Sequence, residues 1–148
     1  MNLTEFVKPL YKDKDSMHDF SHILRIRKRV SELKKNYSVD EGKLEFLIYF
    51  HGLKDYVKKN EKKIVSMGFP KEWINALYRH TKNPKSVEEK IVCDANSLDN
   101  VGKSGLKKCI EYGKSIGRSE EESVKYFKKE VKRIKFYTKE GKLIGNEL

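Results

Sequence analysis

Apolar side chains recur every three or four residues along most of this chain, and only three prolines and nine glycines interrupt the pattern. That spacing is typical of amphipathic α-helices. We therefore predict an all-α protein, one compact domain over residues 1–148, built as a bundle of about six to seven helices. The predicted helices are Ser16 to Asn36, Glu41 to Lys59, Lys62 to Met67, Lys71 to Thr81, Ser86 to Asn96, Lys103 to Ile116 and Ser119 to Tyr137.

Helix ends are marked by familiar capping residues. Ser16 is a predicted N-cap with Asp19 three residues later, and Ser86 and Ser119 each precede acidic residues in capping-box spacing. The tail from Thr138 to Leu148 shows no clear helical pattern, and we expect turns or frayed chain there.

Charge and composition exclude several classes of protein. There are 33 Lys and Arg against 22 Asp and Glu, which gives a net charge of +11. The longest uninterrupted apolar run, Phe46 to Phe50, is five residues, far below the roughly 20 needed to cross a bilayer. The first residues lack the layout of a signal peptide. We expect a cytoplasmic protein without membrane partners, whose positive charge either suits phosphate-bearing partners or only keeps the surface solvated.

The two cysteines, Cys93 and Cys109, form no CxxC pair and no disulfide framework. We expect both to be small, half-buried side chains.

A stripe of polar residues runs along the first predicted helix beside its apolar face. It contains His18, His22, Arg25 and Arg29. Two histidines four residues apart on a helix can chelate one metal ion, and they can equally be partly exposed rings that stack by chance.

Two further residues interrupt apolar segments. His51 ends the most hydrophobic stretch and is predicted to point inward, where a hydrogen-bonded core histidine is the simpler alternative. Asp94 follows three apolar residues, so it needs a charge partner or a cation. In a helical bundle such residues from separate helices can converge on one metal ion.

These motifs resemble the HD (His-Asp) superfamily of metal-dependent phosphohydrolases, in its small single-domain branch. The stretch from His18 to Ile26 resembles HDxxHxxRV, and Asp94 to Gly102 resembles DADxLDxxG. His51 lies at the end of an apolar helix, as the family's second histidine does, and His80 precedes a similar turn. The resemblance covers about residues 15–117 and leaves a C-terminal helix of about 119–137 outside the motifs.

The resemblance implies a set of site residues. His22, His51 and Asp94 would bind one divalent metal ion, either Mn, Fe, Ni or Zn. His18, Arg25 and Lys54 would neutralise a phosphate, and His80 would orient it or protonate the leaving oxygen, so that His80 and His18 are the implied catalytic residues. These are the implied site residues of a phosphomonoesterase or phosphodiesterase acting on a small phosphorylated compound, with nucleotides as the first candidates.

One position departs from the family. Gly52 stands where the Asp of the His-Asp doublet is found, so one metal ligand is missing, and Asp55 one helical turn later is a candidate substitute. The alternative function is a degenerate HD fold that binds a nucleotide or nucleic acid without catalysis.

Two other functions fit parts of the sequence. His18-Asp-Phe-Ser-His22 resembles the HExxH motif of zinc peptidases, but Asp is one methylene shorter than Glu and no third-ligand motif follows. The basic run from Arg25 to Arg29 and the Lys-rich last helix suit a nucleic-acid-binding module, although no phosphate loop or recognition helix is evident.

Overall fold

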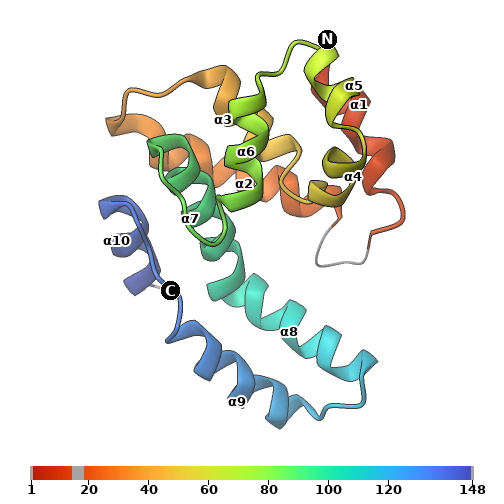
Figure 1. Ribbon diagram of the computed structural model, residues 1–148. Helices are drawn as coiled ribbons and strands as arrows, with labels where there is room; N and C mark the ends of the chain where they lie inside the picture. The colour runs from red at the N-terminus through yellow and green to blue at the C-terminus, as the bar shows by residue number, and fades with distance from the viewer. Residues whose placement is uncertain (1, 15–18, 148) are drawn as a thin grey trace.

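The computed structural model describes residues 2–14 and 19–147, and every regular element within them is a helix (Figure 1). This confirms the predicted all-α class, although the described residues form ten α-helices and not the predicted six to seven. None of the helices in these two segments is long and apolar enough to cross a membrane. The elements are α1 (Leu3–Val7), η1 (Lys8–Tyr11), α2 (Phe20–Leu33), η2 (Lys34–Asn36), α3 (Glu41–Tyr49), α4 (Lys54–Lys59), α5 (Glu61–Ser66), α6 (Lys71–Arg79), α7 (Val87–Val101), α8 (Lys103–Ser115), α9 (Glu120–Val131) and α10 (Lys139–Glu147).

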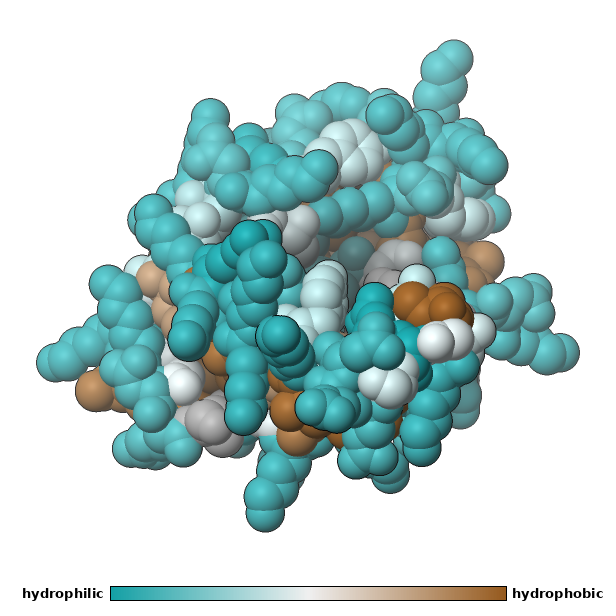
Figure 2. Space-filling model, turned by 90° about the horizontal axis from the view of Figure 1, so that it is seen from below, coloured by the Kyte–Doolittle hydropathy of each residue, from teal (hydrophilic) through white to brown (hydrophobic). Residues whose placement is uncertain are grey.

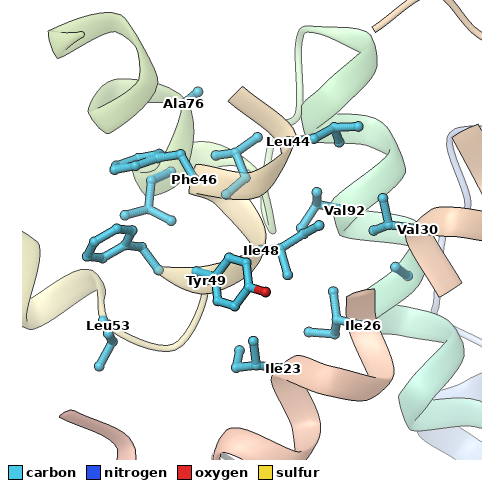
Figure 3. Packing of buried hydrophobic residues seen from close by; sticks show 14 of the residues in the cluster. Ile23, Ile26, Val30, Leu44, Phe46, Ile48, Tyr49, Leu53, Ala76 and Val92 are labelled. Atoms are coloured by element: carbon cyan, nitrogen blue, oxygen red, sulfur yellow. The ribbon is translucent and has the colours of Figure 1, made fainter. Parts of the chain in front are cut away.

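The core lies where α2 and α3 pack against α7, and α6 packs against α3. Ile23, Ile26 and Val30 from α2 meet Ile48 from α3 and Val92 from α7 (Figure 3). The α2 stripe has the spacing that the sequence predicts, and all of these side chains are buried. Burying each one stabilises the fold by about 1.5–3 kcal/mol relative to leaving it exposed.

α7 is the central helix of the fold. It packs against α2, α3, α8 and α10, so apolar and polar residues are buried around much of its circumference. α8 and α9 form an antiparallel hairpin that extends away from this body (Figure 1). Seen from below, the molecule is covered mostly by hydrophilic side chains with separate hydrophobic patches, as the net charge of +11 predicts (Figure 2).

Two of the three predicted caps can be compared with the structure. Ser86 and Ser119 each form a complete capping box at the start of α7 and α9, as predicted. Ser16 lies outside the described residues. The N-cap of α2 is Asp19, whose carboxylate accepts a hydrogen bond from the His22 backbone N–H.

The predicted helix from Glu41 to Lys59 is broken in the structure. α3 ends at Tyr49, the chain turns through residues 50–53, and α4 begins at Lys54. A side chain from another segment stabilises the turn. The Tyr11 hydroxyl donates to the Tyr49 carbonyl at 2.7 Å and accepts from the Gly52 N–H at 3.1 Å. Tyr11 lies in the N-terminal segment, for which the sequence predicted no helix.

The C-terminal segment also differs from the prediction. α9 ends at Val131 rather than at Tyr137, and α10 occupies the tail that was expected to fray. α10 packs on α7, and this contact supplies the stability that its weak apolar pattern does not predict. The two cysteines are as expected, with Cys93 buried and Cys109 partly buried, and both are free.

Candidate functional site

His22 lies in the first turn of α2 and faces α7. Its Nδ1 lies 2.6 Å from Asp99 Oδ2, and its Nε2 lies 3.0 Å from Asn96 Oδ1. A carboxylate and an amide oxygen can only accept hydrogen bonds, so with the amide in this orientation only a doubly protonated ring donates to both. Both ring nitrogens of His22 are therefore held by side chains of α7.

Asp99 is the centre of a buried ionic network. Besides His22 it binds Arg25, whose Nε donates to Oδ1 at 2.8 Å, and Lys108, whose Nζ donates to Oδ2 at 2.6 Å. Burial by itself raises the pKa of this carboxyl, but the hydrogen bonds from His22, Arg25 and Lys108 outweigh burial and hold the pKa below its ordinary value. Asp99 is thus an anion whose charge is already fully compensated.

His51 and His80 form a second pair of rings. His80 is fully buried and its Nδ1 lies 2.6 Å from the Leu77 carbonyl oxygen, so Nδ1 carries the proton. Its Nε2 then accepts from His51 Nδ1 at 2.8 Å, which leaves His51 Nε2 without a proton when the ring is neutral. Burial, with a smaller effect of Lys54, lowers the pKa of His80 to about 4.

The pKa of His51 is lowered as well. Burial is the main cause, and the rings of His80 and His22 add to it. The His22 and His51 ring centroids are 5.6 Å apart, so the two rings lie side by side on the pocket wall. Both His51 and His80 are therefore neutral near pH 7.

A pocket of 290 Å³ opens over the two rings. It is lined by His22, His51, Gly52, Lys54, Asp55 and Thr81. Lys54 begins α4, and its Nζ donates to Thr81 Oγ1 at 2.8 Å. Burial, together with nearby Lys82, lowers the pKa of Lys54 from its ordinary value. Among the described residues that line this wall, the exposed Asp55 is the only one with a carboxylate.

Gly52 is closed to a side chain by Tyr11. A Cβ atom at position 52 would lie 2.8 Å from Tyr11 Cε1, closer than such carbon atoms approach. Burial raises the pKa of the Tyr11 hydroxyl, which keeps it neutral in its two hydrogen bonds. The place where the family has the doublet aspartate is therefore taken by an aromatic ring from the N-terminal segment.

Asp94 does not join the histidines. It is fully buried, as predicted, but both carboxylate oxygens face the C-terminal segment. Oδ1 accepts from the Tyr137 N–H at 2.9 Å, and Oδ2 accepts from the N–H and hydroxyl of Thr138 at 2.7 and 2.6 Å. On an α-helix, residues two apart lie about 200° apart, so Asp94 and Asn96 point in nearly opposite directions. Asn96 is the α7 residue that faces His22.

The other predicted site residues divide between the pocket and its surroundings. Lys54 and Asp55 line the pocket, whereas Arg25 is bound to Asp99 and His80 lies behind His51 with no exposed surface. His18 lies outside the described residues. No sequence pattern assigned a site role to Asp99, Asn96, Lys108, Thr81 or Tyr11, although Asn96 and Asp99 are three residues apart on one face of a helix.

The residues around His22 and His51 include the histidine ligands of a metal centre but not its carboxylate ligands. Each ring has its second nitrogen held by a neighbour, Asp99 or His80, as metal-binding histidines do. The carboxylates are missing, because position 52 is Gly and position 96 is Asn. Among residues 2–14 and 19–147, no three His, Cys, Asp or Glu side chains lie close enough to hold a metal ion. The implied divalent ion does not fit this set of donors.

Similar folds occur among solved structures. The Lin1889 protein of Listeria innocua is 24% identical over 99% of this chain and 89% of its own, with a TM-score of 0.71. YpgQ of Bacillus subtilis, solved in complex with ADP, is 19% identical over 98% and 84%, with a TM-score of 0.76.

A predicted HD superfamily hydrolase from an uncultured Thermotogales bacterium is 18% identical over 98% of this chain and 82% of its own, with a TM-score of 0.66. No protein-family model and no curated protein matches the sequence. This chain therefore shares its all-helical fold with these three structures, one of which is a predicted HD superfamily hydrolase.

Proposed function

We propose that this chain binds the phosphate groups of a small molecule, a nucleotide being the first candidate, in the pocket over His22 and His51, and that it does so without a tightly held metal ion and without hydrolysis. The observation that carries the proposal is the charge of the pocket wall. Lys54 supplies positive charge, and among the described residues that line the pocket the only carboxylate is that of exposed Asp55.

Lys54 is the best-placed ligand for a phosphate oxygen. It is partly buried, held by Thr81 at 2.8 Å, and the pocket offers it no carboxylate partner within salt-bridge distance among the described residues. A cation that is partly desolvated and unpaired gains most from an anionic ligand. The neutral His51 and the Gly52 backbone complete a wall that an anion can approach.

The electrostatics that suit an anion oppose a resident cation. A divalent ion between His22 and His51 would meet two imidazoles and an amide, with Lys54 nearby and, among the described residues that line the pocket, no carboxylate except Asp55. The YpgQ structure holds ADP, which makes ADP a reasonable probe for this chain.

Calorimetry with ADP in the presence of EDTA tests the proposal. Saturable binding without metal is the expected result. Lys54→Ala should weaken it about 10- to 150-fold, since a charge-assisted hydrogen bond contributes about 1.5–3 kcal/mol. Lys58→Ala is the matched control, because it removes the same charge from the exposed side of the same helix and should change the Kd less than twofold.

Metal-dependent phosphohydrolysis is the second candidate, favoured by the two histidines whose outer nitrogens are held in place. It is tested by incubating the protein with Mn, Fe, Ni or Zn, desalting it, measuring metal content, and following phosphate release from ADP and from a phosphomonoester. About one ion per chain together with phosphate release, both lost in His51→Ala, would replace the binding proposal. Negligible metal and no release would support it.

A further inference from the structure

A second and larger pocket lies on the other side of Asp99. It has a volume of 570 Å³ and shares no lining residue with the histidine pocket. Its walls come from α2, from the junction of α7 and α8, and from the end of α10. Nothing in the proposed function uses it.

Four basic side chains line this pocket. Arg25, Lys28 and Arg29 are spaced three and four residues apart on one face of α2, and Lys103 begins α8. Arg29 is paired with Glu32 at 3.1 Å. Lys28 and Lys103 have no carboxylate partner within salt-bridge distance among the described residues.

The carboxylates of the pocket do not cancel this charge. Asp99 is compensated by His22, Arg25 and Lys108, and Glu32 by Arg29. Glu147 is the remaining acidic residue on the wall. The ammonium groups of Lys28 and Lys103 outnumber the Glu147 carboxylate, so the pocket has a net positive charge.

Arg25 offers a specific donor. Its Nε binds Asp99 and its Nη1 donates to Ser21 Oγ at 3.1 Å, while its Nη2 is buried without a hydrogen-bond partner among the described residues. A buried guanidinium nitrogen without an acceptor costs about 1–3 kcal/mol or more, so a small side-chain movement that brings Nη2 to an oxygen in the pocket would be favourable. The network behind Arg25 keeps the guanidinium in this position.

The start of α8 adds to the positive character of the same wall. Its N-cap is Gly102, and no side chain caps its first turn. Gly105 brings this turn close to α7, because a Cβ there would lie 2.2 Å from the Asn100 carbonyl oxygen. The uncapped first-turn amides of α8 therefore lie next to the α2 cations.

We infer that this pocket is a second anion site, which binds the phosphate group of a small phosphomonoester or inorganic phosphate between Arg25, Lys28 and Lys103. A compact, doubly charged group suits a hollow with three donors from two helices. The site is separate from the histidine pocket and does not depend on what that pocket binds.

The test is a titration of ¹⁵N-labelled protein with inorganic phosphate at constant ionic strength, followed by ¹H–¹⁵N correlation spectra. The expected result is saturable shifts of the Ser104 and Gly105 amides and of the Arg25 Nε–H. Lys28→Ala and Lys103→Ala should each weaken this binding about three- to tenfold. Lys107→Ala, which removes an exposed charge from α8 outside the pocket, should leave it unchanged.

Several results would overturn the inference. They are the absence of saturable shifts at Ser104 and Gly105, an equal loss in Lys107→Ala, or shifts produced only by a single-stranded oligonucleotide and not by phosphate. The Gly52 and Thr81 amides report on the histidine pocket in the same spectra. Failure at one pocket is therefore distinguishable from failure at the other.

Discussion

The His22 ring and the Asp99 carboxylate meet at 2.6 Å across the contact between α2 and α7. This one contact connects the histidine pocket to a buried salt-bridge network, since Asp99 also binds Arg25 and Lys108. The position of His22 and the stability of the fold consequently depend on the same carboxylate.

Replacing Asp99 should be strongly destabilising. Asp99→Asn keeps the shape but leaves Arg25 and Lys108 beside a neutral amide, and breaking a buried ion pair in this way costs about 3–5 kcal/mol. Urea denaturation measures the change in the free energy of unfolding. Glu32→Gln, which breaks only the more exposed pair with Arg29, should cost less than about 1 kcal/mol. A cost below about 1 kcal/mol for Asp99→Asn would contradict the network described here.

Asp94 should act on the C-terminal segment and not on metal binding. Asp94→Ala removes the acceptor for Tyr137 and Thr138, which we expect to destabilise the fold by about 3 kcal/mol and to speed amide exchange in α10. Hydrogen exchange measured by mass spectrometry follows residues 137–147 directly. The exposed Glu45→Ala is the control. If exchange in α10 stays slow while retention of a metal ion falls, Asp94 is a ligand and its assignment here is wrong.

A side chain at position 52 should collide with Tyr11. Gly52→Ala places a Cβ atom 2.8 Å from Tyr11 Cε1, so we expect a loss of about 1–3 kcal/mol. In Gly52→Ala with Tyr11→Ala the collision is absent, and the double variant should be more stable than the sum of the single effects predicts. Strict additivity of the two changes would show that the ring does not limit position 52.

Asn96→Asp should create part of the missing metal site. It places a carboxylate 3.0 Å from His22 Nε2, where the amide oxygen now lies. We expect retention of Ni or Zn after desalting to rise at least several-fold over the native chain, because a carboxylate supplies the charge that the two imidazoles lack. Asn100→Asp near the end of α7 adds the same charge away from the rings and should have no such effect. Equal retention in both variants would mean that general charge, not the position of Asn96, governs metal binding.

The two neutral histidines make stability depend on pH. The folded-state pKa of His80 is about 4 and that of the unfolded ring is near 6.5, so the unfolded chain binds more protons between these values. Stability should be fully present above pH 6.5 and fall as the pH approaches 4, by about 3 kcal/mol for His80, with His51 acting in the same direction. Urea midpoints at several pH values test this. His80→Gln should flatten the dependence, and an unchanged slope would exclude His80 as its source.

Sequence patterns that extend over only a few residues were sufficient to predict much of the fold. The three-and-four spacing of apolar residues predicted helices in the positions of α2, α3, α6, α7, α8 and α9, because such a face can be buried only against other helices. Ser86 and Ser119 marked two helix starts through hydrogen bonds that close within four residues. The order of the motifs containing His22, His51 and Asp94 pointed to the HD fold, which the solved structures support.

The sequence by itself therefore determined most of the helices, the all-α fold and the presence of two histidines at one pocket. Only the tertiary structure decided what stands beside those histidines. α7 is buried on opposite faces, so its periodicity could not show that Asn96 faces His22 while Asp94 faces Thr138. Tyr11 reaches Gly52 from 41 residues away. Contacts of this kind depend on how distant segments pack, and no local pattern along the chain encodes them.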